Sequence, residues 1–270
     1  MTTPELLALA RSEADRLNRS DAILTGLERA IADGRLRQDQ LVLYTSHLGD
    51  HSAAALIEAL DPDRLPADGL TADVAHGTIT PMMRDNYRRA NRAARSALLS
   101  DYQAAGIPLD PVAPDFQAAR IEAVEAAAVE RYADPALGIE SVRTLLTGAL
   151  ANITIAMTDN YLEQNAEIAA DVGYRETITR QTDGRCCSWC DDLAGTYDYG
   201  SHPPEIFRRH NNCQCTVIFS CKKGRQNSHT KQWYRSESTK SAAKRADSEA
   251  RRSAADETAR ARAWAAENGG

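Results

Sequence analysis

Long apolar runs are missing from this sequence. Nowhere do about 18 apolar residues follow one another, which excludes a membrane-spanning helix of ordinary length. The first residues, MTTPELLALARSEADR, are charged from Glu5 onward and lack the apolar segment of a signal peptide. We therefore expect no membrane contact and folding in a reducing cytoplasm.

Cysteines and aromatic residues are also scarce. The 270 residues include 6 cysteines, and aromatic residues make up 6% of the chain. Five of the cysteines lie between positions 186 and 215, in the stretches DGRCCSWCDDLAG and HNNCQC. In a reducing compartment, cysteine pairs of this kind are more often metal ligands than disulfides. The cysteine-rich stretch is therefore the first place to look for a site.

Several enzyme motifs and a strongly basic composition are absent. Neither G-x-S-x-G nor G-x-x-x-x-G-K-[ST] occurs, so the usual serine-hydrolase and phosphate-loop signatures are excluded. The net charge of −6 conceals an asymmetry, because residues 222–270 carry 12 Lys/Arg against 6 Asp/Glu. An acidic body with a mildly basic tail is not the composition of a dedicated nucleic-acid binder, although the tail can contact a polyanion.

What is present is mostly helical pattern, and we predict a mainly α fold. Residues 1–172 are predicted to form a helical domain, because apolar residues recur there at helical spacing in segments separated by Pro, Gly and Asp residues typical of loops. Residues 173–221 are predicted to form a small β-rich module, and residues 222–270 a basic polar tail that is partly helical. The helices are expected over 3–20, 20–34, 39–60, 80–106, 114–135 and 139–170, and the strands over 174–182, 195–200 and 215–219.

Four cysteines and one histidine of the β-rich module have the spacing of metal ligands. Cys187 and Cys190 form C-S-W-C, in which a tight turn aims both sulfurs at one ion. Cys213 and Cys215 form C-Q-C at the start of a strand, where alternate side chains share a face. His210 is a fifth candidate. It either replaces one cysteine of the second pair as a ligand or contacts the ligands without binding the ion itself. Two convergent cysteine pairs suit tetrahedral zinc best.

Other interpretations of the cysteines stay open. Two disulfides would form if the chain worked in an extracellular particle. A thioredoxin-like redox role is disfavoured, since no βαβ pattern surrounds the C-x-x-C, and nothing indicates an iron–sulfur cluster. With four protein ligands a zinc ion has no open position and is structural, contributing ~10 kcal/mol or more to the folding of such a module. Cys186 and Cys221 are treated as spare.

The order of these residues resembles the C-terminal module of MuF-like phage head morphogenesis proteins, also called minor capsid proteins. The likeness covers about 50 to 60 of the 270 residues. Asn211 and Gln214 stand where many members have proline and arginine, and the later stretch KKGRQNSHTKQW is similar to a basic segment of a related subset. The matching positions are Asp183, Cys187, Cys190, Leu193, Gly195, His210, Cys213 and Cys215.

The resemblance implies a non-enzymatic structural role. Such proteins lie in few copies inside the phage head and associate with the portal and the major capsid protein. They assist assembly, DNA packaging or ejection, so the expected location is the virion, and the host cytoplasm during assembly. The basic tail is then expected to touch packaged double-stranded DNA.

Two other functions compete with this expectation. Arg208, Arg209 and His210, followed by two asparagines, resemble pieces of an HNH-type metal-dependent nuclease, which needs a further metal ligand on a following helix. A zinc-ribbon interaction module is the second alternative, disfavoured for nucleic acid by the acidic residues of 174–221. Elsewhere, His47 and His51 have the spacing of a metal pair on a helix, but we interpret them as surface histidines.

Overall fold

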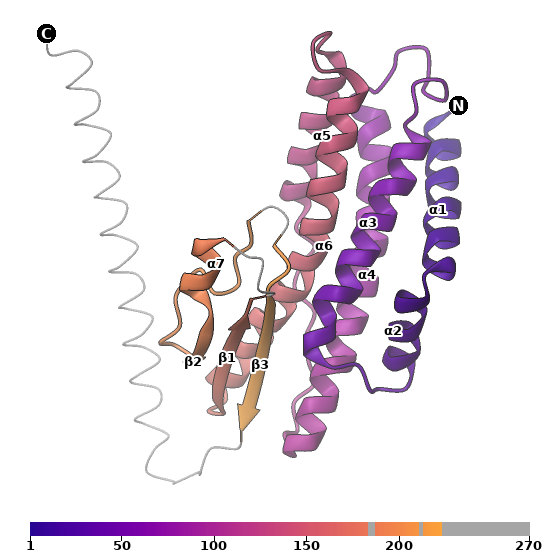
Figure 1. Ribbon diagram of the computed structural model, residues 1–270. Coiled ribbons are helices and arrows are strands. Elements are labelled where there is room, and N and C mark those ends of the chain that lie inside the picture. Colours follow the sequence, from indigo (N-terminus) through magenta and orange to yellow (C-terminus); the bar gives the residue numbers. More distant parts are fainter. Residues whose placement is uncertain (183–186, 211–212, 223–270) are drawn as a thin grey trace, which may run out of the picture.

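The computed structural model describes residues 1–182, 187–210 and 213–222. The described chain is mainly helical, with a small three-stranded antiparallel sheet in its C-terminal region (Figure 1). This confirms the predicted fold class for the helical body and the β-rich part. The predicted helical character of the basic tail concerns residues 223–270, which lie outside the described residues.

The helices follow the predicted pattern closely, with one early start. The bounds are α1 Thr3–Ser20, α2 Ala22–Ala32, the 3-10 helix η1 Gln38–Gln40, α3 Leu41–Ala59, α4 Ala72–Ala105, α5 Ala118–Ala133 and α6 Gly138–Asp171. The expected start of α4 near residue 80 is wrong, because Pro81 lies inside the helix rather than at its beginning. Val74 and Ile79 are buried in the bundle before the proline, and this packing extends the helix backwards to its cap at Thr71.

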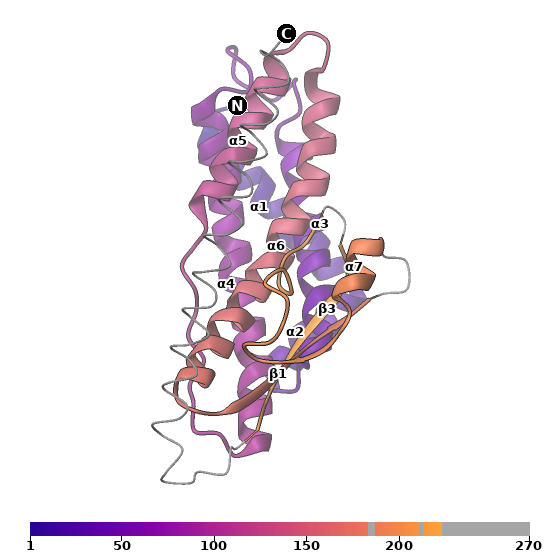
Figure 2. The same cartoon turned by 90° about the vertical axis from the view of Figure 1, so that its left-hand side faces the viewer.

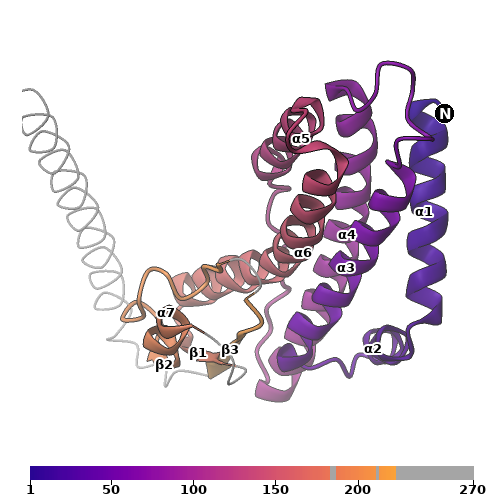
Figure 3. The same ribbon diagram turned by 45° about the horizontal axis from the view of Figure 1, so that its top comes forward.

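The helical bundle is held together by one extended apolar core between α1, α3, α4, α5 and α6. Helices α3 and α6 approach each other closely at Gly49. A Cβ atom on Gly49 would lie 2.5 Å from the Cα atom of Ala151, so only glycine fits there. This close approach fixes the position of α6, which continues to the sheet (Figure 3).

The sheet has the order β2-β1-β3, with β1 in the centre. Its bounds are β1 Arg175–Gln181, β2 Gly195–Asp198 and β3 Thr216–Lys222, and the short helix α7 covers Ser188–Leu193 between β1 and β2. In β1 the buried positions alternate, so Glu176, Ile178 and Arg180 share the face that is turned inward. Ile178 lies opposite Tyr197 of β2 and Phe219 of β3.

The sheet packs against the lower part of the helical bundle (Figures 1 and 2). Ile178, Val217 and Phe219 belong to one buried cluster with residues of α2, α3, α4 and α6. The Phe219 ring meets that of Tyr102 in α4 edge to face, with 6.4 Å between the ring centroids. The few apolar side chains of the sheet are therefore buried by the helices, and the sheet shares their core.

Two segments join this shared core from outside the regular elements. Ile206 and Phe207 are buried in it, although residues 204–207 form a turn and belong to no helix or strand. The Gln38 side chain of η1 bonds both backbone groups of Phe219, accepting from its N–H at 2.8 Å and donating to its carbonyl at 2.6 Å. Helix η1 thereby fastens the outer edge of β3 to the bundle.

No described helix combines the length and apolar character needed to cross a membrane.

Candidate metal centre

The predicted ligands come from three short segments that meet beside the sheet. Cys187 is the N-cap residue of α7 and Cys190 lies in its first turn. The C-x-x-C segment thus begins a short helix, where we expected a tight turn. Cys213 and Cys215 come directly before β3 rather than within it, and His210 lies in the loop that precedes them.

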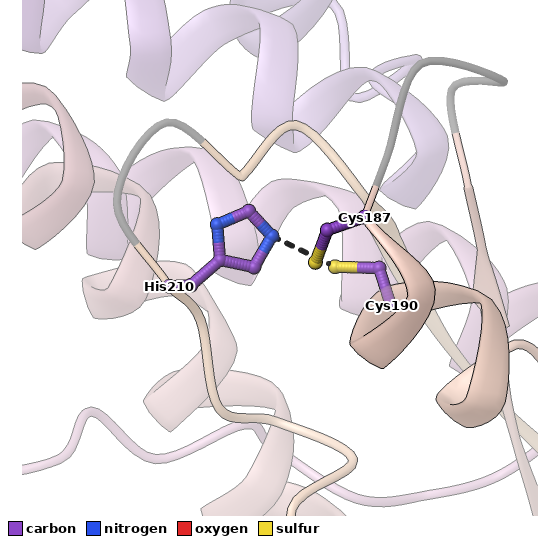
Figure 4. A group of neighbouring side chains, drawn as sticks. All are labelled: Cys187, Cys190 and His210. Carbon is purple, nitrogen blue, oxygen red and sulfur yellow. Dashed lines mark hydrogen bonds between the residues drawn. The ribbon is translucent and has the colours of Figure 1, made fainter.

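The structure brings all five predicted ligands into two overlapping groups that share Cys190. In one group the ligand atoms of Cys187, Cys190 and His210 lie within 4.8 Å of one another (Figure 4). In the other group the sulfurs of Cys190, Cys213 and Cys215 do so. His210 Nε2 lies 3.0 Å from Cys190 Sγ, so this histidine joins the C-x-x-C segment and not the second cysteine pair.

The two groups differ in their access to solvent. Cys190, Cys213 and Cys215 are almost completely buried and form a small cluster of their own. Cys187 is exposed, and His210 is partly exposed with the Trp189 ring packed edge to face at 5.9 Å between centroids. Sulfur and imidazole ligands gathered in this way can hold a metal ion, reached from the side of Cys187.

A buried arginine lies directly behind the sulfurs. The Arg180 side chain is 1% exposed, and its Nη2 atom lies 3.7 Å from Cys190 Sγ and 3.5 Å from Cys213 Sγ. Its Nη1 atom donates to two backbone carbonyls, and its guanidinium carbon lies 5.4 Å from the centroid of the Trp189 ring. Because a guanidinium is always protonated, its contact with both sulfurs stabilises their thiolate forms.

A second buried arginine ties the cysteine loop to α6. Arg209 forms an ion pair with Asp159, in which Nη2 donates to Oδ1 at 2.9 Å, and the two side chains are 1% and 3% exposed. The same guanidinium donates to the backbone carbonyl of Cys215 at 2.6 Å and contacts Cys213 Sγ at 3.7 Å. One charged side chain therefore positions both cysteines relative to the helical bundle.

The thiols of the buried cluster do not ionise alike. Burial raises the pKa of the Cys190 and Cys215 thiols. Burial acts in the same direction on Cys213, but the backbone N–H of Cys215 and the charge of Arg209 outweigh it and lower the pKa of the Cys213 thiol. Without a metal ion, Cys213 is thus the first of the three to become a thiolate, the form that binds metal.

The sequence did not reveal that charged residues lie behind the sulfurs. Asp159 lies 50 positions before Arg209 on another element, and no local pattern links the two. A signal for Arg180 does exist, since it continues the inward alternation of Glu176 and Ile178 along β1. Of the spare cysteines, Cys221 lies in β3, and Cys186 falls outside the described residues.

Comparisons of this chain with protein-family descriptions, with curated proteins and with solved structures find no match.

Proposed function

We propose that the cysteine–histidine centre binds one structural zinc ion. The observation that carries this proposal is the spacing of the buried sulfurs. At a Zn–S distance of about 2.3 Å, two sulfurs of a tetrahedral site lie about 3.7 to 3.8 Å apart. Cys190 Sγ and Cys213 Sγ are 3.7 Å apart, and Cys190 belongs to both ligand groups.

The surroundings of the sulfurs support a closed, structural site. Four thiolates or three thiolates and an imidazole give zinc a net negative charge, which the buried guanidinium groups of Arg180 and Arg209 offset. Five donors compete for four positions, so one of the five is the spare residue. Zinc in this place would join α7, His210 and the cysteines before β3 into one unit.

The ligands can be assigned by substituting them one at a time. We expect zinc content to fall from about one per chain to near zero for four of the single variants and to persist for the fifth, measured by elemental analysis. Cys221→Ser is the matched control, because Cys221 lies in β3 outside both ligand groups. Four thiols that stay blocked in denatured, unreduced protein without zinc would instead establish two disulfides.

For the whole chain we propose the role of a minor capsid protein of the MuF-like kind, acting near the portal during head assembly, DNA packaging or ejection. The support is the order of Cys187, Cys190, His210, Cys213 and Cys215, whose side chains gather at one place beside the sheet. His210 faces the Cys190 sulfur, which suits a ligand better than the general base of a nuclease.

This role predicts that the chain is incorporated into phage particles and depends on its metal centre. Particles assembled with Cys190→Ser should contain several-fold less of the protein than particles assembled with Cys221→Ser, as quantified by mass spectrometry. Normal incorporation of a zinc-free Cys190→Ser chain would contradict the link between the centre and the particle. Metal-dependent DNA cleavage by the purified chain, lost in His210→Ala, would replace the proposal with the nuclease alternative.

A further inference from the structure

Outside the cysteine centre, two histidines of α3 face the residue that caps the α2 helix. His47 and His51 are one turn apart, and their ring nitrogens lie with a carboxylate oxygen of Asp21 inside a 4.8 Å group. Asp21 is the N-cap residue of α2, and its Oδ1 atom accepts hydrogen bonds from the backbone N–H groups of Ile23 and Leu24. The other oxygen, Oδ2, is left to face the two histidines.

The hydrogen bonding of His51 leaves a lone pair directed at that carboxylate. His51 Nδ1 lies 2.8 Å from the Asn18 side-chain oxygen, which only accepts, so Nδ1 carries the hydrogen. In the neutral ring, Nε2 is then an acceptor, and it lies 3.4 Å from Asp21 Oδ2. Two acceptors that face each other at this distance are stabilised by a cation between them.

The distances suit a metal ion in this place. Two nitrogen or oxygen ligands at about 2.0 to 2.1 Å from tetrahedral zinc lie about 3.3 to 3.4 Å apart, as His51 Nε2 and Asp21 Oδ2 do. His47 Nδ1 is closer, at 2.6 Å from the same oxygen, which is a hydrogen-bond distance. An ion would replace that proton after the partly exposed His47 ring withdraws by somewhat less than about 1 Å.

The neighbouring groups orient the ligands and add negative charge. An imidazole whose other nitrogen donates to a carbonyl oxygen is the usual arrangement of a metal-bound histidine, and Asn18 supplies that oxygen to His51. The Asp50 carboxylate acts electrostatically on both histidines. Arg89, which opposes a cation here, is paired with Glu28 at 2.8 Å.

We propose that Asp21, His47 and His51 form a second metal site, for a divalent ion such as Zn²⁺ that accepts imidazole and carboxylate ligands. Three protein ligands leave at least one position for water or another ligand, unlike the closed cysteine centre. The bound ion would cross-link the start of α2 to α3. This proposal does not depend on the function proposed for the cysteine centre, since the two sites share no residue.

The test is a titration of Zn²⁺ into the reduced, metal-free full chain, followed by calorimetry and elemental analysis. We expect two classes of zinc site, of which the double variant His47→Gln/His51→Gln loses one and keeps the other. His76→Gln is the matched control, because His76 also pairs with a carboxylate, Glu125 at 3.1 Å, and it should keep both classes. Equal zinc binding by the wild type and the double variant, whatever the number of classes, would overturn the proposal.

A second measurement uses the unmodified protein, so it does not depend on the folding of a variant. Nitrogen NMR of the histidine rings should show His51 with its hydrogen on Nδ1, and zinc should shift the Nε2 resonance. At zinc concentrations about 100-fold above the dissociation constant of this site, the thermal midpoint should rise by about 5 °C more in the wild type than in the double variant. An unshifted Nε2 resonance at saturating zinc would exclude His51 as a ligand.

Discussion

The ion pair between Asp159 and Arg209 makes a strong quantitative prediction. Both side chains are almost completely buried, and Arg209 also holds the backbone carbonyl of Cys215 in the cysteine loop. The Asp159→Asn substitution leaves the guanidinium in the same place without its counter-charge. Removing one partner of a buried pair costs about 3 to 5 kcal/mol, because the remaining charge is neither solvated nor compensated.

The assay is urea unfolding of the metal-loaded protein, followed by circular dichroism. With a slope of about 3 kcal/mol per molar urea, the unfolding midpoint of Asp159→Asn should fall by about 1 to 1.7 M. Asp110→Asn is the control, because its ion pair with Arg95 is exposed and should change the free energy of unfolding by less than about 1 kcal/mol. The double variant Asp159→Asn/Arg209→Gln should lose much less than the sum of the two single losses.

A loss below about 1 kcal/mol for Asp159→Asn would refute this reasoning. It would mean that solvent reaches the guanidinium, or that the cysteine loop does not depend on its attachment to α6. An additive double variant would show that the two side chains act independently.

Three further predictions follow from single buried positions. Burial raises the pKa of Glu176 to about 9, so between about pH 4.5 and 9 the folded state holds a proton that the unfolded state has released. The stability should therefore fall as the pH rises through this range. Glu176→Gln should remove this pH dependence and stabilise the protein at pH 8 by on the order of 1 to 3 kcal/mol, measured by urea titration. Gly49→Ala should destabilise by about 1 to 3 kcal/mol because the new methyl group would meet the Ala151 backbone. A Cβ atom added at Gly148 would meet no atom of a neighbouring segment within 4 Å, so Gly148→Ala should stabilise by about 0.5 to 1 kcal/mol in thermal melts. Gln38→Ala should cost about 2 kcal/mol or more by chemical unfolding, since two buried backbone groups of β3 lose their partners.

Most of the helices could be predicted from local signals in the sequence. The second helix was predicted over 20–34, and Asp21 at its start accepts hydrogen bonds from two free N–H groups of the first turn of α2. The strand over 174–182 was recognised from its β-branched residues, and β1 spans Arg175–Gln181. The misplaced start of α4 has a physical cause, because a proline is a helix-start signal unless tertiary packing on both sides outweighs its missing N–H.

The site was only partly accessible from the sequence. The cysteine and histidine spacing located the ligands, since short motifs are local. The part that Arg180, Arg209 and Asp159 play behind the sulfurs was not predicted, because their contacts join distant segments whose meeting depends on how the sheet packs on α6. His47 and His51 were visible as a pair, but the carboxylate that faces them comes from the cap of another helix.

The attachment of β3 to Gln38 also bears on how the chain behaves at high concentration. A side-chain amide has N–H donors and a carbonyl acceptor side by side, as a peptide group does. The Gln38 amide therefore occupies the hydrogen-bonding positions of Phe219 that a foreign strand would use. Phe219 is the middle residue of β3. Edge strands left open recruit other chains and start aggregation, and a single residue from η1 closes this one at its centre.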